Sequence, residues 1–259
     1  KVEQSSYRVA YENFVVAAIM WYNRIMEITW NLWHGCHKYS AGCKNCYVYR
    51  QDGKHDVDSA KVRKTANFSL PVARGRNGEY KYPSGTCFMT CFTSDFLIEE
   101  ADGWRGEAWN IIRERSDCEF VFITKRIIRF KDCLPADWGD GWDNVSVGCT
   151  VENNVEAARR MPVFRDAPIK NRFVCCEPLL EKVDLSPWLD GRTDMVIAGG
   201  ESGVDVRECD YDWVLDLRRQ CVKAGVSFRF KQTGAIFKKD GRYYSVPRKL
   251  QHVQAKKAG

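Results

Sequence analysis

The stretch Glu119-Phe-Val-Phe-Ile-Thr-Lys-Arg126 contains the pattern that decides the fold, because a short run of aromatic and β-branched residues gives way to charged side chains. Buried strands of parallel sheets have this composition. Six comparable runs recur, at residues 27–30, 87–92, 145–149, 172–176, 195–198 and 226–230. Amphipathic, helix-like segments lie between several of them, at residues 104–115, 154–160 and 212–224. Strands that alternate with helices predict parallel βαβ units and an α/β fold.

Polar side chains follow nearly every one of these runs. They are Ser94, Asp95, Lys125, Arg126, Thr150, Glu152, Glu177, Glu201, Lys231 and Gln232. The carboxyl ends of the strands in a TIM-type barrel meet at one rim, where active sites are built. The sequence therefore predicts a complete or partial TIM-type (β/α) barrel, with parallel strands and outer helices, rather than a doubly wound sheet. At any single position, a polar residue is also what an ordinary strand end contains.

Three cysteines lie close together after the first predicted strand. Six residues separate Cys36 from Cys43-Lys-Asn-Cys46, so three thiols fall within eleven residues. Three thiolates can hold a 4Fe–4S cluster and leave one iron without a protein ligand, as a position for a substrate. A structural zinc site also uses Cys-x-x-Cys, and His34, His37 or a remote cysteine would complete it. The spacing leaves both kinds of metal centre open.

Seven motifs in a fixed order carry a resemblance to a known family. They are Trp30-Asn-Leu-Trp-His-Gly-Cys36, Gly42-Cys-Lys-Asn-Cys-Tyr47, Thr93-Ser-Asp-Phe96, Ile123-Thr-Lys-Arg126, Arg172-Phe-Val-Cys-Cys-Glu-Pro178, Gly199-Gly-Glu-Ser-Gly203 and Phe230-Lys-Gln-Thr-Gly234. The chain resembles the bacterial and phage three-Cys-motif family, a family of unknown function that is similar to radical S-adenosylmethionine (SAM) proteins such as spore photoproduct lyase. One departure is the six-residue gap after Cys36, where radical SAM proteins usually have three residues.

The resemblance also divides the chain. It implies a radical SAM-like barrel domain over residues 26–236, which includes a basic insertion at about residues 55–85. Residues 1–25 lie outside the resemblance as an N-terminal extension, and residues 237–259 form a basic C-terminal tail. A partner protein encoded alongside this one is a further implication.

Roles for the rim residues follow from the resemblance. A 4Fe–4S cluster on Cys36, Cys43 and Cys46 would bind SAM and deliver the electron that cleaves it. Contacts to SAM are expected from Ser94, Asp95, Lys125, Thr150, Glu152, Gly199 and Gly200, the two glycines because they let a ligand approach the backbone closely. The expected catalytic residues are Glu177, Glu201 and Lys231.

The positive charge of the chain is concentrated in two stretches. The formal net charge is +6, and residues 237–259 hold seven Lys and Arg residues against the single acid Asp240. Residues 61–81 form a second basic stretch, with Phe68, Tyr80 and Tyr82 in or beside it. Basic stretches with aromatic residues are typical of surfaces that bind nucleic acid, although solvated loops and tails also contain them. A nucleic acid or a nucleotide is therefore the expected substrate.

Composition excludes several classes of protein. No apolar run reaches the roughly 18 residues that a membrane span requires, so no membrane association is expected. The twelve cysteines, mostly isolated in apolar runs, indicate reduced thiols and predict a cytoplasmic location.

Two functions are compatible with these observations. The first is a radical SAM-like iron–sulfur enzyme of undetermined reaction, and the second is a zinc-stabilised, non-catalytic binding module of phage or mobile-element origin.

Overall fold

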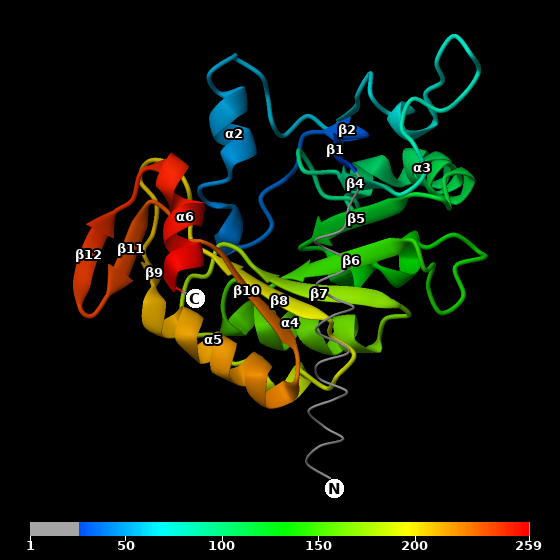
Figure 1. Ribbon diagram of the computed structural model, residues 1–259. Helices are drawn as coiled ribbons and strands as arrows, with labels where there is room; N and C mark the ends of the chain where they lie inside the picture. The colour runs from blue at the N-terminus through cyan, green and yellow to red at the C-terminus, as the bar shows by residue number, and fades with distance from the viewer. Residues whose placement is uncertain (1–25, 259) are drawn as a thin grey trace, which may run out of the picture.

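A seven-stranded parallel sheet forms the centre of the computed structural model, which describes residues 26–258 (Figure 1). The strands are β1 (Met26–Trp30), β4 (Thr86–Thr90), β5 (Glu119–Thr124), β6 (Val145–Thr150), β7 (Asn171–Cys176), β8 (Met195–Gly199) and β10 (Ser227–Gln232). Each of them overlaps one of the seven predicted runs, with ends that differ by up to two residues. The predicted α/β class is therefore confirmed.

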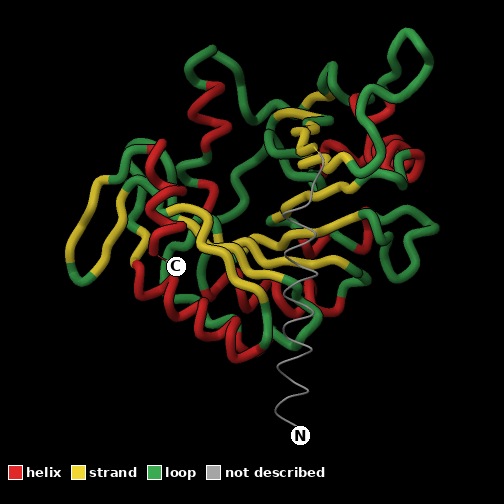
Figure 2. The backbone as a smooth tube through the Cα atoms, viewed as in Figure 1, coloured by secondary structure: helices red, strands yellow, loops and turns green. Residues whose placement is uncertain are grey.

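The sheet is curled but open, as Figure 2 shows. Its strand order, β1-β4-β5-β6-β7-β8-β10, follows the chain without a reversal. A doubly wound sheet reverses its order at a switch point, so that alternative is excluded. Within the described residues β1 and β10 are the two edges and do not pair with each other. The architecture is thus a half-barrel, and the complete barrel that we allowed from the sequence is not found.

Helices cover the outer face of the half-barrel. They are α3 (Asp102–Glu114), α4 (Asn154–Asp166) and α5 (Tyr211–Ala224), which agree with the three predicted helical segments. Short 3-10 helices complete the connections, namely η3 (Glu99–Ala101), η4 (Ile127–Arg129), η5 (Lys131–Cys133) and η6 (Ser186–Trp188). The outer helices place the carboxyl ends of all seven strands at one edge.

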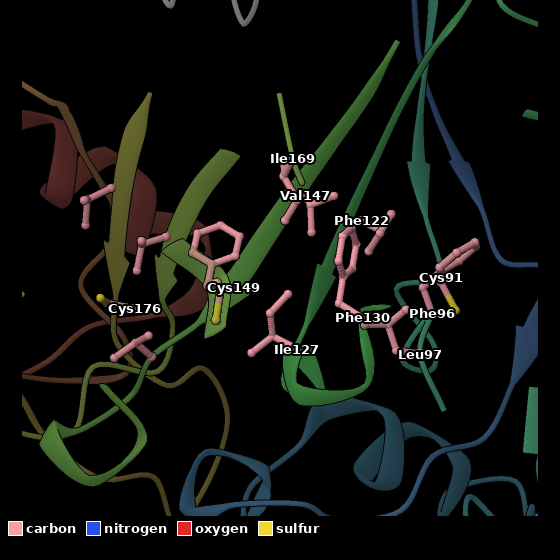
Figure 3. Close-up of a cluster of buried hydrophobic side chains, with 14 of the residues drawn as sticks. Cys91, Phe96, Leu97, Phe122, Ile127, Phe130, Val147, Cys149, Ile169 and Cys176 are labelled. Atoms are coloured by element: carbon pink, nitrogen blue, oxygen red, sulfur yellow. The ribbon is translucent and has the colours of Figure 1, made fainter. Parts of the chain in front are cut away.

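Side chains alternate between the two faces of each strand, and this alternation divides the core in two. On the outer face, the rings of Phe88 and Phe120 stack at 5.2 Å, and Trp30 packs edge-on against Phe120. Figure 3 shows Phe122 of β5 in this cluster, with neighbours from adjacent strands. The inner face holds a smaller apolar cluster of Cys87, Val121, Phe173, Cys175, Met195 and Ile197.

Two smaller units flank the half-barrel. One contains β2 (Trp33–His34), η1 (Ala41–Cys43), α2 (Tyr47–Asp52), β3 (Arg63–Lys64) and η2 (Leu70–Val72). The other contains β9 (Cys209–Asp210), β11 (Ile236–Lys239), β12 (Arg242–Ser245) and α6 (Arg248–Ala258). The expected basic tail is therefore a folded hairpin and helix, and α6 lies against β10 with Gln251 and Ala255 buried.

The expected N-terminal extension, residues 1–25, lies outside the described residues. Across residues 26–258, no helix combines the length and the apolar character that a membrane crossing needs.

Candidate functional site

A cavity of about 300 Å³ opens at the carboxyl edge of the sheet. Its walls include Cys36, Cys43 and Cys46 together with most of the predicted rim residues, namely Ser94, Asp95, Lys125, Thr150, Glu177, Gly200, Glu201 and Lys231. Glu152 and Gly199 are not among the lining residues. The structure thus brings together side chains that are up to about 200 positions apart in the sequence, because parallel strands share one carboxyl edge.

The three cysteines lie on a segment that we call the Cys loop, residues 35–52. The backbone N–H of Cys36 donates to the carbonyl of Ser59 at 2.8 Å, and the Tyr49 hydroxyl donates to the carbonyl of Cys36. At the far end of the loop, the Asp52 carboxylate lies 2.8 Å from Nε2 of His34 and accepts from Ser59 at 2.6 Å. These contacts fasten the end of α2 beside β2, so that both arms of the Cys loop are held at the cavity.

The three thiols share the cavity without forming a metal centre in this arrangement. Nη1 of Arg126 lies 3.6 Å from Sγ of Cys36, and burial, above all, raises the pKa of Cys36 to about 12. Among residues 26–258, no group of three or more His, Cys, Asp or Glu side chains is close enough to hold a metal ion. The donor set nevertheless fits a metal in its chemistry, because three free thiols line one cavity and thiolates bind both zinc and iron–sulfur clusters.

Cys91 lines the cavity although we did not select it from the sequence. It follows β4 directly, is 3% exposed, and has a φ of 65°, in the left-handed region that non-glycine residues rarely adopt. Burial, followed by the charges of Asp95 and Cys36, raises its pKa well above the usual value. The predicted run, residues 87–92, included Cys91, so the sequence offered no signal that its thiol lines the cavity.

Glu152 holds the Cys loop rather than facing the cavity. Its side chain is fully buried, and Oε2 accepts from Nη1 of Arg160 at 2.8 Å. Oε1 accepts from the backbone N–H of Gly42 at 3.1 Å and from the Ser40 hydroxyl. Burial acts to raise the pKa of Glu152, but Arg160 and these hydrogen bonds outweigh it and keep the pKa below its usual range. The carboxylate therefore remains charged and ties the loop to the sheet.

Glu201 makes the equivalent contact on the opposite side of the loop. Oε2 accepts from Nδ2 of Asn45 at 2.9 Å and from the backbone N–H of Arg207 at 2.9 Å. Arg207 also forms an ion pair with the same carboxylate. Burial raises the pKa of Glu201, but the hydrogen bonds from Arg207 and Asn45 outweigh it, and the net pKa is lowered. Glu201 thus links the Cys loop to the segment after β8, across the open side of the half-barrel.

Two more predicted cofactor contacts are already engaged by protein groups. Asp95 is 5% exposed and accepts from the Thr124 hydroxyl at 2.7 Å and from the backbone N–H of Lys125 at 2.9 Å. The Ser94 hydroxyl donates to the carbonyl of Gly35. Both residues therefore fix the loops after β4 and β5, even though they line the cavity.

The two glycines after β8 make room for protein atoms. A Cβ on Gly199 would lie 2.4 Å from Oε1 of Glu177, and a Cβ on Gly200 would lie 2.5 Å from the carbonyl of Thr233. We expected these glycines to admit a ligand to the backbone. In the structure the space beside them is taken by Glu177 and by the chain after β10, although Gly200 still lines the cavity.

The remaining polar groups are directed at the cavity itself. Nζ of Lys231 lies 2.9 Å from Oε2 of Glu177, and Nε2 of Gln232 donates to Oε1 of Glu177 at 3.3 Å. Burial acts to lower the pKa of Lys231, but the Glu177 carboxylate outweighs it, so the pKa of Lys231 is raised and its ammonium stays charged. Within the described chain the ammonium of Lys125 has no ion pair, although it lines the same cavity.

Fold and site together define an α/β half-barrel protein with a thiol-lined cavity at the carboxyl edge of its sheet. A family model described as a protein of unknown function (DUF5131) matches residues 17–259, so the chain belongs to this family. The match begins upstream of Met26 and includes the C-terminal hairpin and helix. Neither a curated protein nor a solved structure matches the chain, so no comparison links it to radical SAM proteins.

Proposed function

We propose that this protein is a radical SAM-like iron–sulfur enzyme, with a 4Fe–4S cluster on Cys36, Cys43 and Cys46 and SAM beside it in the cavity. The observation that carries the proposal is that all three thiols of one loop line the cavity at the carboxyl edge of a parallel half-barrel. Three thiolates leave one iron of such a cluster open. Binding requires the thiols to turn toward one another and to lose their protons, so cluster assembly is linked to proton release.

The cavity residues divide the remaining tasks. Reductive cleavage of SAM is the chemistry that the bound cluster would supply. Lys125, which has no ion pair in the described chain, is the cation available to a carboxylate of the cofactor. Thr150 lines the same wall, and its hydroxyl forms no hydrogen bond to another group within residues 26–258. Glu177 and Lys231 form the charged pair that holds or moves a proton at the substrate.

A nucleic acid or nucleotide is the proposed substrate, and the two basic stretches support it unequally. Lys64 forms an ion pair with Glu107, and Nη2 of Arg74 lies 3.8 Å from Glu114. Part of the positive charge in residues 61–81 is therefore neutralised within the protein. The C-terminal hairpin and helix keep more unpaired cations. The twelve free thiols support a reducing, cytoplasmic compartment.

Calorimetry and product analysis test this function. Reconstituted protein should bind SAM and, on reduction of the cluster, release 5'-deoxyadenosine. The variant Lys125→Ala should weaken SAM binding by about 10- to 100-fold, because a charge-assisted contact is lost. The matched control is Lys170→Ala, which should leave binding unchanged because Lys170 pairs with Asp143 outside the cavity. If the cluster is intact but SAM does not bind, the enzymatic proposal is wrong, and the protein would only carry the cluster.

A further inference from the structure

The hairpin β11–β12 and helix α6 form a unit with a cleft of its own. We call residues 236–258 the C-terminal unit. A cavity of about 440 Å³ lies between the hairpin and α6, separate from the rim cavity. Its lining combines apolar and aromatic side chains with two cations and comprises Phe237, Lys239, Tyr244, Ser245, Val246, Pro247, Leu250, Gln254, Lys257 and Ala258. A ligand that fits it needs a flat apolar part and a negative charge.

Most cations of the C-terminal unit are free of acidic partners. Lys238 is neutralised, because its Nζ lies 2.9 Å from Asp210, and Lys239 lies over the ring of Tyr211. The described residues contain no acidic side chain that pairs with the other five, which are Arg242, Arg248, Lys249, Lys256 and Lys257. A surface with five unpaired cations and one acid, Asp240, favours a polyanion.

Aromatic side chains stand at the free edge of this unit. β12 is the outer strand of a small sheet with the order β12-β11-β9, and all four of its residues are exposed. The exposed fraction is 61% for Tyr243 and 45% for Tyr244, and Tyr244 also lines the cleft. Exposed tyrosines among lysines and arginines match the surfaces on which unpaired bases stack.

The C-terminal unit is hydrogen-bonded to the rim cavity. Oγ of Ser202, a rim residue, lies 2.6 Å from Oε1 of Gln251 on α6 and 2.8 Å from Oε1 of Gln232 at the rim. The single hydroxyl proton of Ser202 can serve only one of these acceptors at a time. Nδ1 of His252 lies 2.8 Å from the carbonyl of Lys231. A ligand on the C-terminal unit is therefore beside the rim cavity.

We propose that the C-terminal unit is a docking surface for single-stranded nucleic acid, with one base in the cleft against Tyr244 and the flanking phosphates on the unpaired cations. A single strand fits better than a duplex, because a duplex keeps its bases stacked inside and offers no free ring to the cleft. The inference deepens the proposed function by naming its substrate class. It does not depend on any of the three cysteines, so the two proposals can fail separately.

Fluorescence anisotropy with a labelled oligothymidylate of about 15 nucleotides tests the docking surface, with a duplex of equal length for comparison. Five phosphate contacts predict that affinity for the single strand falls about a hundredfold between roughly 50 and 200 mM salt, since each contact adds about 0.7 to the logarithmic slope. Lys256→Gln should reduce that slope by about 0.7. The charge-matched control Lys170→Gln, at a lysine that already pairs with Asp143, should leave the slope unchanged.

Tyrosine variants test the cleft. Tyr244→Ala should weaken binding of the single strand by about 5- to 150-fold, the range for loss of one stacked base, whereas Tyr244→Phe should retain it. Circular dichroism on both variants checks that the hairpin is folded. Equal loss in both tyrosine variants, or an equal slope change in Lys170→Gln, would overturn the proposal. Tighter binding to vesicles of phosphatidylserine than to oligothymidylate would also overturn it and assign the surface to lipid.

The same assay separates this proposal from the proposed function. Cys43→Ala cannot complete the cluster, but it leaves the C-terminal unit intact, so it should bind oligothymidylate as tightly as the unaltered protein. Loss of binding in Cys43→Ala would contradict an independent docking surface. If no oligonucleotide binds, although the cluster is intact and SAM binds normally, the docking-surface proposal is wrong and the enzymatic proposal is unaffected.

Discussion

Replacing Glu152 with glutamine should release the Cys loop from the sheet. The Glu152 carboxylate joins Arg160, on α4, to Ser40 and Gly42 in the loop. The side chains of Glu152 and Arg160 are both fully buried. The variant Glu152→Gln therefore leaves the buried guanidinium of Arg160 with less negative charge beside it. It also replaces the charged acceptor for Ser40 and Gly42 with a neutral one.

The size of this effect follows from the surroundings of Arg160. Removing one partner of a buried ion pair costs about 3–5 kcal/mol. Glu156 reduces this cost, because its carboxylate lies 2.8 Å from Nη2 of Arg160 and is 12% exposed. The glutamine oxygen also keeps one hydrogen bond. We expect the free energy of unfolding to fall by about 2–3 kcal/mol.

Glu156→Gln is the matched control, because Glu156 pairs with the same arginine and, in the part of the chain that the structure describes, its side chain forms no hydrogen bond or ion pair with the Cys loop. Urea unfolding measures stability, and mass spectrometry follows alkylation of Cys43 by iodoacetamide in the metal-free protein. Both variants should lose stability, but only Glu152→Gln should accelerate the alkylation. Equal acceleration in both, or a stability of Glu152→Gln within about 0.5 kcal/mol of the unaltered protein, would refute the assigned role of Glu152.

Three further predictions concern single positions. Gly148→Ala places a methyl group 2.4 Å from the Phe173 ring and should lower the free energy of unfolding, measured in urea, by about 1–3 kcal/mol. An unchanged urea midpoint would contradict this prediction and show that the ring is free to move. Asp52→Ala removes the acceptor for Ser59 and the partner of His34, and it should lower the free energy of unfolding by about 1–3 kcal/mol. Asp52→Asn should lower it less, and the reverse order would contradict the role of Asp52 in fastening α2 beside β2. The lowered pKa of Glu201 means that its charge stabilises the fold above the unfolded pKa of about 4.3, and this contribution is lost as pH falls through the lower folded value. The stability difference between the unaltered protein and Glu201→Gln should therefore shrink below about pH 4, and a constant difference would contradict the link to Asn45 and Arg207.

The strands of the half-barrel were predictable because each one is buried and bounded by polar residues. Phe120 and Phe122 are fully buried, and the chain turns polar at Lys125, where β5 has ended. The C-terminal unit was not predictable in the same way. Lys238, Lys239 and Arg242 made its short strands resemble a charged tail, and β11 pairs not only with β12 but also with β9, which is distant in the sequence.

The candidate site was predictable as a set of positions and less so as a set of roles. The carboxyl ends of parallel strands share one edge, so Lys125, Glu177 and Lys231 were expected to meet and do so. The contacts of Glu152 and Glu201 with the Cys loop depend on how that loop folds back over the sheet. No local sequence pattern encodes such contacts.

Metal analysis of protein purified without oxygen tests the central claim most directly. The proposed cluster predicts about four irons per chain and a brown colour. Alanine at Cys36, Cys43 or Cys46 should abolish iron binding, whereas Cys221→Ala, at a buried thiol of α5 away from the cavity, should retain it. Colourless protein with about one zinc per chain, or iron that survives all three substitutions, would contradict the account.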